Sequence, residues 1–268
     1  MSNHLLRSHA PISDDAWDAI DEEARERLVA ALSARKLVDF SGPNGWAYSA
    51  TNLGRTEPIA QAPCDGVHGL RRRVLALAEV RAPFTVSREE LRAADRGAED
   101  VDFAALDQAA RNMAVAENKA VFHGWPEAGF TGITEASPHR VPRGGDFDDY
   151  PSHVAKAVEL LLQSGIAGPY GLALGTEDYT AVVETAEHGG YPLFDHLRQI
   201  LGGPIAWSPG VLGGVVLSQR GGDFLFESGQ DLVVGYDHHD ADAVHLYIEQ
   251  SFSFRVATPE AAVALVPV

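Results

Sequence analysis

The feature that most constrains the fold is a long extended segment at residues 46–80. Apolar residues alternate with polar ones near both of its ends, while Pro58, Pro63 and Gly66 interrupt its middle. The tip of the segment has too few apolar residues to bury a core of its own. It therefore either packs back on the body of the protein or reaches a neighbouring subunit.

An amphipathic helix is predicted before this segment, at residues 13–36. Ser13 is a suitable N-cap, and Asp14 and Asp15 lie in the first turn, where the helix dipole favours negative charge. One face is an apolar stripe made of Trp17, Ile20, Ala24, Leu28 and Leu32. The other face carries opposite charges four positions apart, namely Asp21 with Arg25 and Glu23 with Arg27. Such a helix must lie on an apolar surface.

The remainder of the chain mixes helical and extended patterns without repeats, low-complexity segments or a linker. From Ile205 onward the pattern is β, and the strands come from distant parts of the chain. Helical patterns occupy residues 87–122, a segment that opens at Pro151, and residues 176–187 and 192–201. The fold class predicted is α+β, in a single unit.

The charge of the chain argues against nucleic-acid and membrane partners. Its 38 acidic and 21 basic residues give a formal net charge of -17, whereas nucleic acids and anionic membranes require clustered positive charge. Cys64 is the only cysteine, so neither an intrachain disulfide nor a cysteine-based metal cluster can form. Neither a signal-peptide pattern nor an apolar stretch of membrane-spanning length occurs. We expect a cytoplasmic protein, or one exported by an unconventional route.

No pattern of residues supports catalysis. The densest polar stretch is residues 237–245, where His238 and His239 could in principle bind a divalent ion. A polar turn between two strands is the favoured interpretation, because adjacent side chains on an extended chain point apart. The glycine pairs at residues 213–214 and 221–222 lack the context of a nucleotide-binding loop. We therefore predict no catalytic residue, no metal ligand and no cofactor.

Short segments spread over nearly the whole chain carry a resemblance to a known family. In order and spacing, they are similar to segments of the encapsulin shell proteins, whose early name was the linocin-type bacteriocin family. The segments are residues 10–17, 42–46, 81–85, 122–124, 132–133, 168–170, 188–192, 220–224, 229–232, 235–236 and 252–254. Residues 238–242 match no family motif, which weakens the metal interpretation further.

The resemblance implies the fold of tailed-bacteriophage major capsid proteins, which has a peripheral domain, an axial domain and an extended loop. The expected divisions are the N-terminal helix and the start of the peripheral domain at 1–45, the extended loop at 46–80, the peripheral domain with its spine helix at 81–132, the axial domain at 133–227, and C-terminal peripheral strands at 228–268. By this analogy, the extended segment reaches a neighbouring subunit.

The resemblance also implies a function. Copies of the chain would close into an icosahedral nanocompartment around a cargo enzyme, a dye-decolourising peroxidase or a ferritin-like protein, which serves oxidative-stress defence or iron storage. The cargo's C-terminal peptide would bind between the N-terminal helix and the peripheral domain, at Leu28, Leu32, Arg35, Val38, Phe40, Leu232, Val234 and Tyr236. A pore on the five-fold axis would be lined by Glu187, His188, Gly189, Gly190 and Tyr191.

Two alternatives belong to other functional classes. A phage-derived capsid protein that packages nucleic acid would need a positive interior, and the net charge of -17 disfavours it. A secreted antibacterial protein or protease would need a nucleophile constellation or an export signal, and the sequence contains neither.

Overall fold

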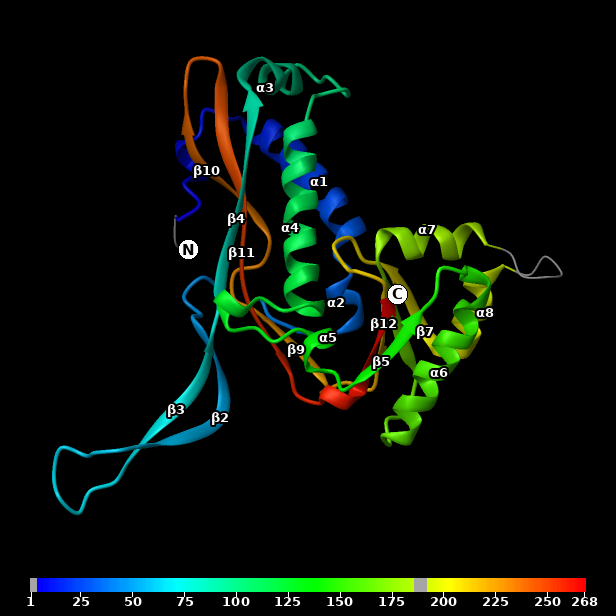
Figure 1. The fold of residues 1–268 in the computed structure, drawn as a ribbon. Coiled ribbons are helices and arrows are strands. Elements are labelled where there is room, and N and C mark those ends of the chain that lie inside the picture. The colour runs from blue at the N-terminus through cyan, green and yellow to red at the C-terminus, as the bar shows by residue number, and fades with distance from the viewer. Residues whose placement is uncertain (1–3, 186–191) are drawn as a thin grey trace.

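The computed structural model describes residues 4–185 and 192–268. Figure 1 shows a body built around two sheets and a thin two-stranded ribbon that extends away from it. Each sheet has five strands. One apolar core lies between the first sheet and the helices that cover it, and a second core spans the second sheet and the adjoining end of the first. The α+β class predicted from the sequence is confirmed.

The first sheet is organised around β11 (Ala243–Val256), its longest strand. β4 (Ala78–Ser87) pairs antiparallel with β11 from Ala243 to Phe252, whereas β10 (Val233–His239) and β9 (Phe224–Ser228) pair with its first and last parts. Among the strands of the described residues, β10 pairs only with β11 and is therefore an edge strand. The remaining member is β1 (Asp39–Ser41).

Three helices cover this sheet. α4 (Ala104–Phe122) packs on β4 and β11, and α1 (Asp14–Ala31) packs across α4 and against β10. α3 (Arg88–Asp95) contacts the start of α1. As predicted, the Ser13 side chain caps α1 by accepting the N–H of Ala16 at 3.1 Å. The apolar stripe of α1 is buried in the core of the first sheet, as its helical spacing predicts.

The helix predicted at residues 13–36 is interrupted, so that part of the prediction is wrong. α1 ends at Ala31, and a short α2 (Ala34–Leu37) follows. The buried Asn118 side chain causes the break: its Oδ1 accepts the N–H groups of Ser33 (3.2 Å) and Ala34 (3.1 Å), and its Nδ2 donates to the carbonyl of Ala31 (3.0 Å). The amide thus satisfies backbone groups that a continuous helix would have paired.

The second sheet forms the other half of the body (Figure 1). β6 and β8 are buried along their whole lengths because helices and neighbouring strands cover them. The strands follow the order β5 (His139–Arg143), β12 (Ala262–Pro267), β8 (Gly214–Ser218), β6 (Tyr170–Leu174) and β7 (Gly202–Trp207). The helices against it are α6 (Tyr150–Gln163), α7 (Thr176–Glu184) and α8 (Leu193–Leu201). The short helices are η1 (Arg7–His9), η2 (Pro126–Ala128), α5 (Ile133–Ala136), η3 (Phe147–Asp149) and η4 (Pro259–Ala261).

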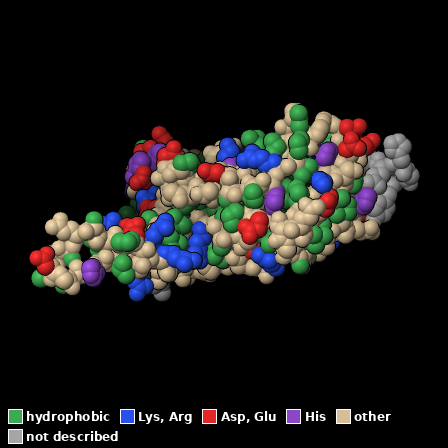
Figure 2. Space-filling view, turned by 60° about the horizontal axis from the view of Figure 1, so that its bottom comes forward, with side chains coloured by type: hydrophobic (Ala, Val, Ile, Leu, Met, Phe, Trp, Pro, Cys, Tyr) green, Lys and Arg blue, Asp and Glu red, His purple; other side chains and the backbone are tan. Residues whose placement is uncertain are grey.

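The ribbon consists of β2 (Ala50–Ile59) and β3 (Gly69–Ala76), paired antiparallel. Its base is attached to the first sheet, where the Thr51 hydroxyl lies 2.7 Å from Ser253 Oγ and donates to Glu227. Beyond the base it extends into solvent and does not pack back on the body, as Figures 1 and 2 show from two sides. Of the two arrangements that the sequence left open, packing back on the body is therefore wrong.

Candidate functional site

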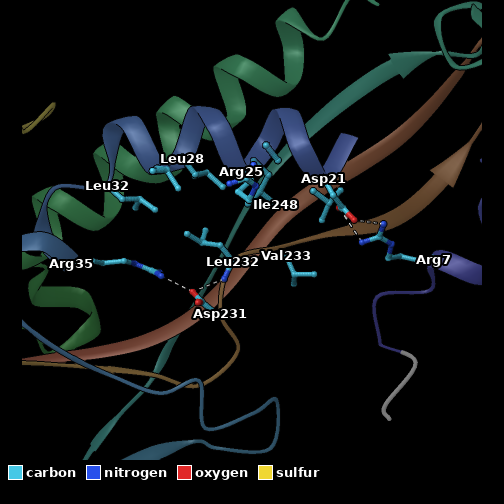
Figure 3. A pocket seen from close by; sticks show the side chains of 13 residues that line it. Arg7, Asp21, Arg25, Leu28, Leu32, Arg35, Asp231, Leu232, Val233 and Ile248 are labelled. Atoms are coloured by element: carbon cyan, nitrogen blue, oxygen red, sulfur yellow. Dashed lines mark hydrogen bonds and ion pairs between the residues drawn. The ribbon is translucent and has the colours of Figure 1, made fainter. Parts of the chain in front are cut away.

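A groove of about 410 Å³ lies between α1 and the edge of the first sheet. Figure 3 shows α1 above it and β10 and β11 below it, with side chains from both sides directed into the space between them. Its lining combines Arg7, Asp21, Ala24, Arg25, Leu28, Val29, Leu32, Arg35, Asp231, Leu232, Val233, Val234 and Ile248.

The walls of the groove are apolar. Leu28 and Leu32 come from the end of the α1 stripe, and Leu232 faces them from the segment before β10. Val234 of β10 also lines the groove. The two leucines are only 6% and 7% exposed, so they serve the core and the groove wall together. Val29 lies at the rim and is 57% exposed. An apolar hollow of this kind suits aliphatic side chains of a ligand.

An ion pair closes each end of the groove (Figure 3). At one end, Arg7 of η1 binds Asp21 of α1 through two bonds, Nη1–Oδ1 at 3.1 Å and Nη2–Oδ2 at 2.7 Å. At the other end, Arg35 of α2 donates from Nη1 to Asp231 Oδ1 at 2.6 Å. The Arg7 guanidinium also lies 3.9 Å from the centroid of the Trp17 ring, which fixes it further.

Arg35 is held from behind by a buried carboxylate. Its Nε and Nη2 groups donate to Glu117 at 2.9 and 2.8 Å, and Nη2 also donates to Gln250 Oε1 at 2.6 Å. Burial raises the pKa of Glu117, although the nearby guanidinium opposes this effect. Burial acts to lower the pKa of Arg35, but Glu117 and Asp231 outweigh it and raise that pKa. Arg35 is therefore a fixed cation with little freedom to move.

The structure brings five of the eight residues predicted for peptide binding to this groove: Leu28, Leu32, Arg35, Leu232 and Val234. The other three lie outside its lining. Val38 and Phe40 pack against the other apolar core, which joins the second sheet to one end of the first, and the Phe40 ring stacks there on Phe226 of β9 at 5.4 Å. Tyr236 lies farther along β10, where its hydroxyl bonds to His239 Nδ1 at 2.6 Å.

Sequence reasoning missed Arg7, Asp231 and Ile248, and it assigned Asp21 the wrong partner. Asp21 pairs with Arg7 rather than with Arg25, which instead bonds to Glu22, with Nε–Oε2 at 3.2 Å. The predicted pair of Glu23 with Arg27 is confirmed at 2.6 Å. Helical spacing could predict the pair of Glu23 with Arg27, which lies within one helix. It could not predict the pair of Arg7 with Asp21, because Arg7 belongs to a segment outside the helix.

The polar stretch at residues 237–245 forms the hairpin between β10 and β11, so the turn interpretation is confirmed. Asp240 accepts the N–H groups of Asp242 and Ala243, each at 2.8 Å, and its other oxygen lies 3.1 Å from His245 Nε2. The bond to His245 and these two backbone bonds lower the pKa of Asp240 to about 2. Within residues 4–185 and 192–268, no group of three or more His, Cys, Asp or Glu side chains could hold a metal ion.

Two further sequence predictions concern other parts of the chain. The five residues predicted for the pore, 187–191, lie outside the described residues. In the part of the chain that is described, no helix combines the length and apolar character needed to cross a bilayer. Cys64 is an exposed free thiol near the tip of the ribbon.

Solved structures of a virus-like particle and of a phage share this architecture. The virus-like particle of Pyrococcus furiosus superposes with a TM-score of 0.65 at 17% identity, covering 93% of this chain and 98% of that one. The Mycobacterium phage Ogopogo structure gives a TM-score of 0.56 at 13% identity, covering 89% of this chain and 92% of that one. The fold is therefore that of tailed-phage major capsid proteins, as the sequence resemblance implied.

Sequence relatives narrow this class to one family. A family model described as "Encapsulating protein for peroxidase" matches residues 2–253. The type 1 encapsulin shell protein of Rhodospirillum rubrum is 46% identical, covering 98% of this chain and 96% of the relative. The type 1 encapsulin shell protein of Rhodococcus erythropolis is 41% identical, and the match covers 98% of this chain and 99% of the relative. The chain belongs to the type 1 encapsulin shell proteins, which confirms the predicted family.

Proposed function

We propose that copies of this chain close into an icosahedral nanocompartment and that the groove beside α1 holds the C-terminal targeting peptide of a cargo enzyme. The observation that carries the proposal is the open apolar groove with an ion pair at each end, in a chain of the encapsulin shell family. The chain has a structural role here, and its cargo performs the chemistry.

The ribbon supports assembly. Leu70 and Val74 are 64% and 55% exposed in the single chain, and Ile59 and Val67 are exposed as well. Apolar side chains on a two-stranded ribbon need a further surface to cover them, because such a ribbon is marginal alone. A neighbouring subunit supplies that surface. The contact joins unlike surfaces, so repeated copies close into rings and a shell.

The size and chemistry of the groove support an extended peptide as the ligand. A volume of about 410 Å³ accommodates two or three aliphatic side chains. A short peptide with so few anchors binds only modestly by itself. Many grooves on one closed inner wall raise the effective concentration, so the cargo is retained although each contact is weak.

The cargo is an enzyme of oxidative chemistry, a dye-decolourising peroxidase or a ferritin-like protein. The description of the family model, "Encapsulating protein for peroxidase", supports the first of these. The net charge of -17 disfavours nucleic acid as the content of the shell. The assembled particle resides in the cytoplasm, and residues 187–191 line its five-fold pore.

Purification from the source organism tests this function. Negative-stain microscopy should show closed hollow particles, and mass spectrometry should identify one co-purifying enzyme with an extended apolar C-terminal tail. Particles that contain nucleic acid and no enzyme would contradict the proposal. A cargo whose retention survives removal of its C-terminal tail would contradict the assignment of the groove.

A further inference from the structure

The two strands of the ribbon carry a charge opposite to that of the whole chain. Their sequences contain Arg55, Arg71, Arg72 and Arg73, and Glu57 is the one acidic residue in them. The chain as a whole has a formal net charge of -17. All of these arginines are exposed, and Figure 2 shows basic side chains on the ribbon. The ribbon is therefore a local concentration of positive charge that projects from an acidic protein.

The register of the two strands sorts these residues onto two faces. Arg55 lies directly opposite Arg73, and Glu57 lies directly opposite Arg71. Residues that face each other across an antiparallel pair share a face, as do residues two apart on one strand. These four residues therefore form one surface, the arginine face of the ribbon. The distance of 3.4 Å between Arg71 Nη1 and Glu57 Oε1 agrees with this arrangement.

The other face of the ribbon is mainly apolar. Leu70 and Arg72 lie opposite Pro58 and Thr56, and Val74 follows on the same face of β3. Leu70 and Val74 are the exposed side chains that support contact with a neighbouring subunit. The ribbon thus offers two chemically different surfaces, and apolar contact accounts for only one of them.

The arginine face destabilises the isolated ribbon. Arg55 and Arg73 place like charges directly across a strand pair, which opposes the pairing. The ion pair of Arg71 with Glu57 compensates little, because the two side chains are 71% and 48% exposed. Three arginines and one glutamate leave an excess of positive charge on this face. Contact with a negatively charged surface would relieve the repulsion.

A second copy of the chain offers such a surface. One acidic region lies at the corner where α1 meets α3. Asp14, Asp15 and Asp18 are exposed in the first turns of α1, and the exposed Asp95 of α3 is joined to them by its hydrogen bond with Ser13. Complementary charge on two surfaces guides their association and fixes their orientation.

We propose that the arginine face of the ribbon binds an acidic surface of a neighbouring copy of this chain. The inference rests on the proposed function, in which the ribbon contacts a neighbouring subunit. Because only one face is cationic, the charges also determine which way round the ribbon lies. A ribbon turned over would place three arginines against the apolar contact and leave them without negative partners. Nucleic acid is the competing partner for a cationic face.

Charge reversal at Arg55 separates docking from the stability of the ribbon itself. In Arg55→Glu, the new carboxylate lies opposite Arg73, so the ribbon gains a pair of opposite charges. Its contact with an acidic neighbour should nevertheless weaken. We expect the concentration of free subunit in equilibrium with closed shells to rise roughly tenfold. Arg55→Lys keeps the charge and should match the parent. Sedimentation velocity over a dilution series measures the free subunit.

Salt dependence shows whether charge causes the loss. The difference between Arg55→Glu and the parent should shrink as sodium chloride rises from about 0.05 M to about 0.5 M, because mobile ions screen exposed charges. An Arg55→Glu variant that closes as well as the parent, or a loss that salt does not change, would overturn the inference and leave the proposed function standing. Parent chains that do not assemble would overturn both. Nucleic acid bound to parent shells and lost in Arg55→Glu, with closure unchanged, would assign the face to that partner instead.

A carbodiimide, which joins an amine to a carboxylate in direct contact, tests the partner itself. The chain has lysines only at Lys36, Lys119 and Lys156. Arg73→Lys therefore introduces an amine on the arginine face, and Arg72→Lys is the matched control on the apolar face. We expect the Arg73→Lys shells to give covalent dimers on denaturing gels, several-fold more than either the parent or Arg72→Lys shells. Equal yields of dimer from the two variants would contradict the proposed contact.

Discussion

Arg35 and Glu117 form a salt bridge behind the groove, with Nη2–Oε2 at 2.8 Å and the Glu117 side chain wholly buried. The pair joins α2 to the middle of α4, and Asp231 extends it to the segment before β10. It thereby holds together three elements that surround one end of the groove.

Removal of the cation should destabilise the chain in a pH-dependent manner. In Arg35→Met, the buried Glu117 loses its partner, which costs about 3–5 kcal/mol near neutral pH. Because burial raises the pKa of Glu117 above the unfolded value of 4.5, the folded state keeps the proton to higher pH than the unfolded state does. The charge-dependent loss of stability is therefore full above the folded pKa of Glu117, shrinks as pH falls from that pKa toward 4.5, and is absent below about 4.5.

Urea unfolding of the variant between pH 4 and 8 measures this effect. The matched control is the double variant Arg35→Met with Glu117→Gln, which removes both charges and should recover most of the stability at pH 7. If Arg35→Met loses the same stability at every pH, the unpaired charge of Glu117 is not the cause of the loss.

The groove assignment predicts that an inserted charge reduces cargo loading. Leu32→Glu places a carboxylate in the apolar wall, so both packing and peptide affinity should fall. Val234→Asp should act in the same direction from the opposite wall. Val183→Glu is a control, because Val183 is 54% exposed on α7 and lies outside the groove. The readout is cargo per shell, taken only from variants whose shells close. If closed shells of Leu32→Glu carry as much cargo as the parent shells do, the cargo peptide binds somewhere other than this groove.

The separation in sequence between two interacting residues decides whether their contact in this site could be predicted. The α1 stripe, the Ser13 cap and the Glu23–Arg27 pair depend on neighbours a few positions apart, and helical spacing reveals them. The break after Ala31 depends on Asn118, and the Arg7–Asp21 pair depends on the path of the N-terminal segment. Neither leaves a local pattern, so neither could be predicted.

The fold itself was predictable for a different reason. Segment order and spacing identified the family, while the chain's own patterns supplied only an α+β class and an extended segment unable to form a core. Val38 and Phe40 show the limit of that approach. They follow the helix directly in sequence, but the break at Ser33 redirects the chain, and both side chains pack in the other core.

The ribbon should be essential for assembly and nearly irrelevant to the fold of the single chain. Leu70→Glu combined with Val74→Glu charges two exposed positions, so the body should keep its circular dichroism spectrum while shell closure is lost. Leu162→Glu charges an exposed position on α6 and is the matched control. Closed particles from the double ribbon variant would show that these side chains do not meet a neighbouring subunit.

The hairpin at residues 237–245 should lose stability in strong acid. The pKa of Asp240, lowered to about 2, lies below the unfolded value of 3.8, so its contribution is present above pH 4 and is lost as pH falls through about 2. Asp240→Asn should therefore melt at a lower temperature than the parent at pH 5, with the difference shrinking toward pH 2. Asp237→Asn should shift melting less, because the Asp237 carboxylate bonds to His238 rather than to the turn backbone. A difference that stays constant with pH would contradict the role of the Asp240 charge.

The central claim is that this chain exists as a closed shell, and sedimentation velocity tests it most directly. The purified chain at micromolar concentration should sediment as one large species with almost no free subunit, because the ribbon exposes apolar side chains in the single chain and the proposed assembly would cover them. A stable monomer or dimer under these conditions would contradict the account.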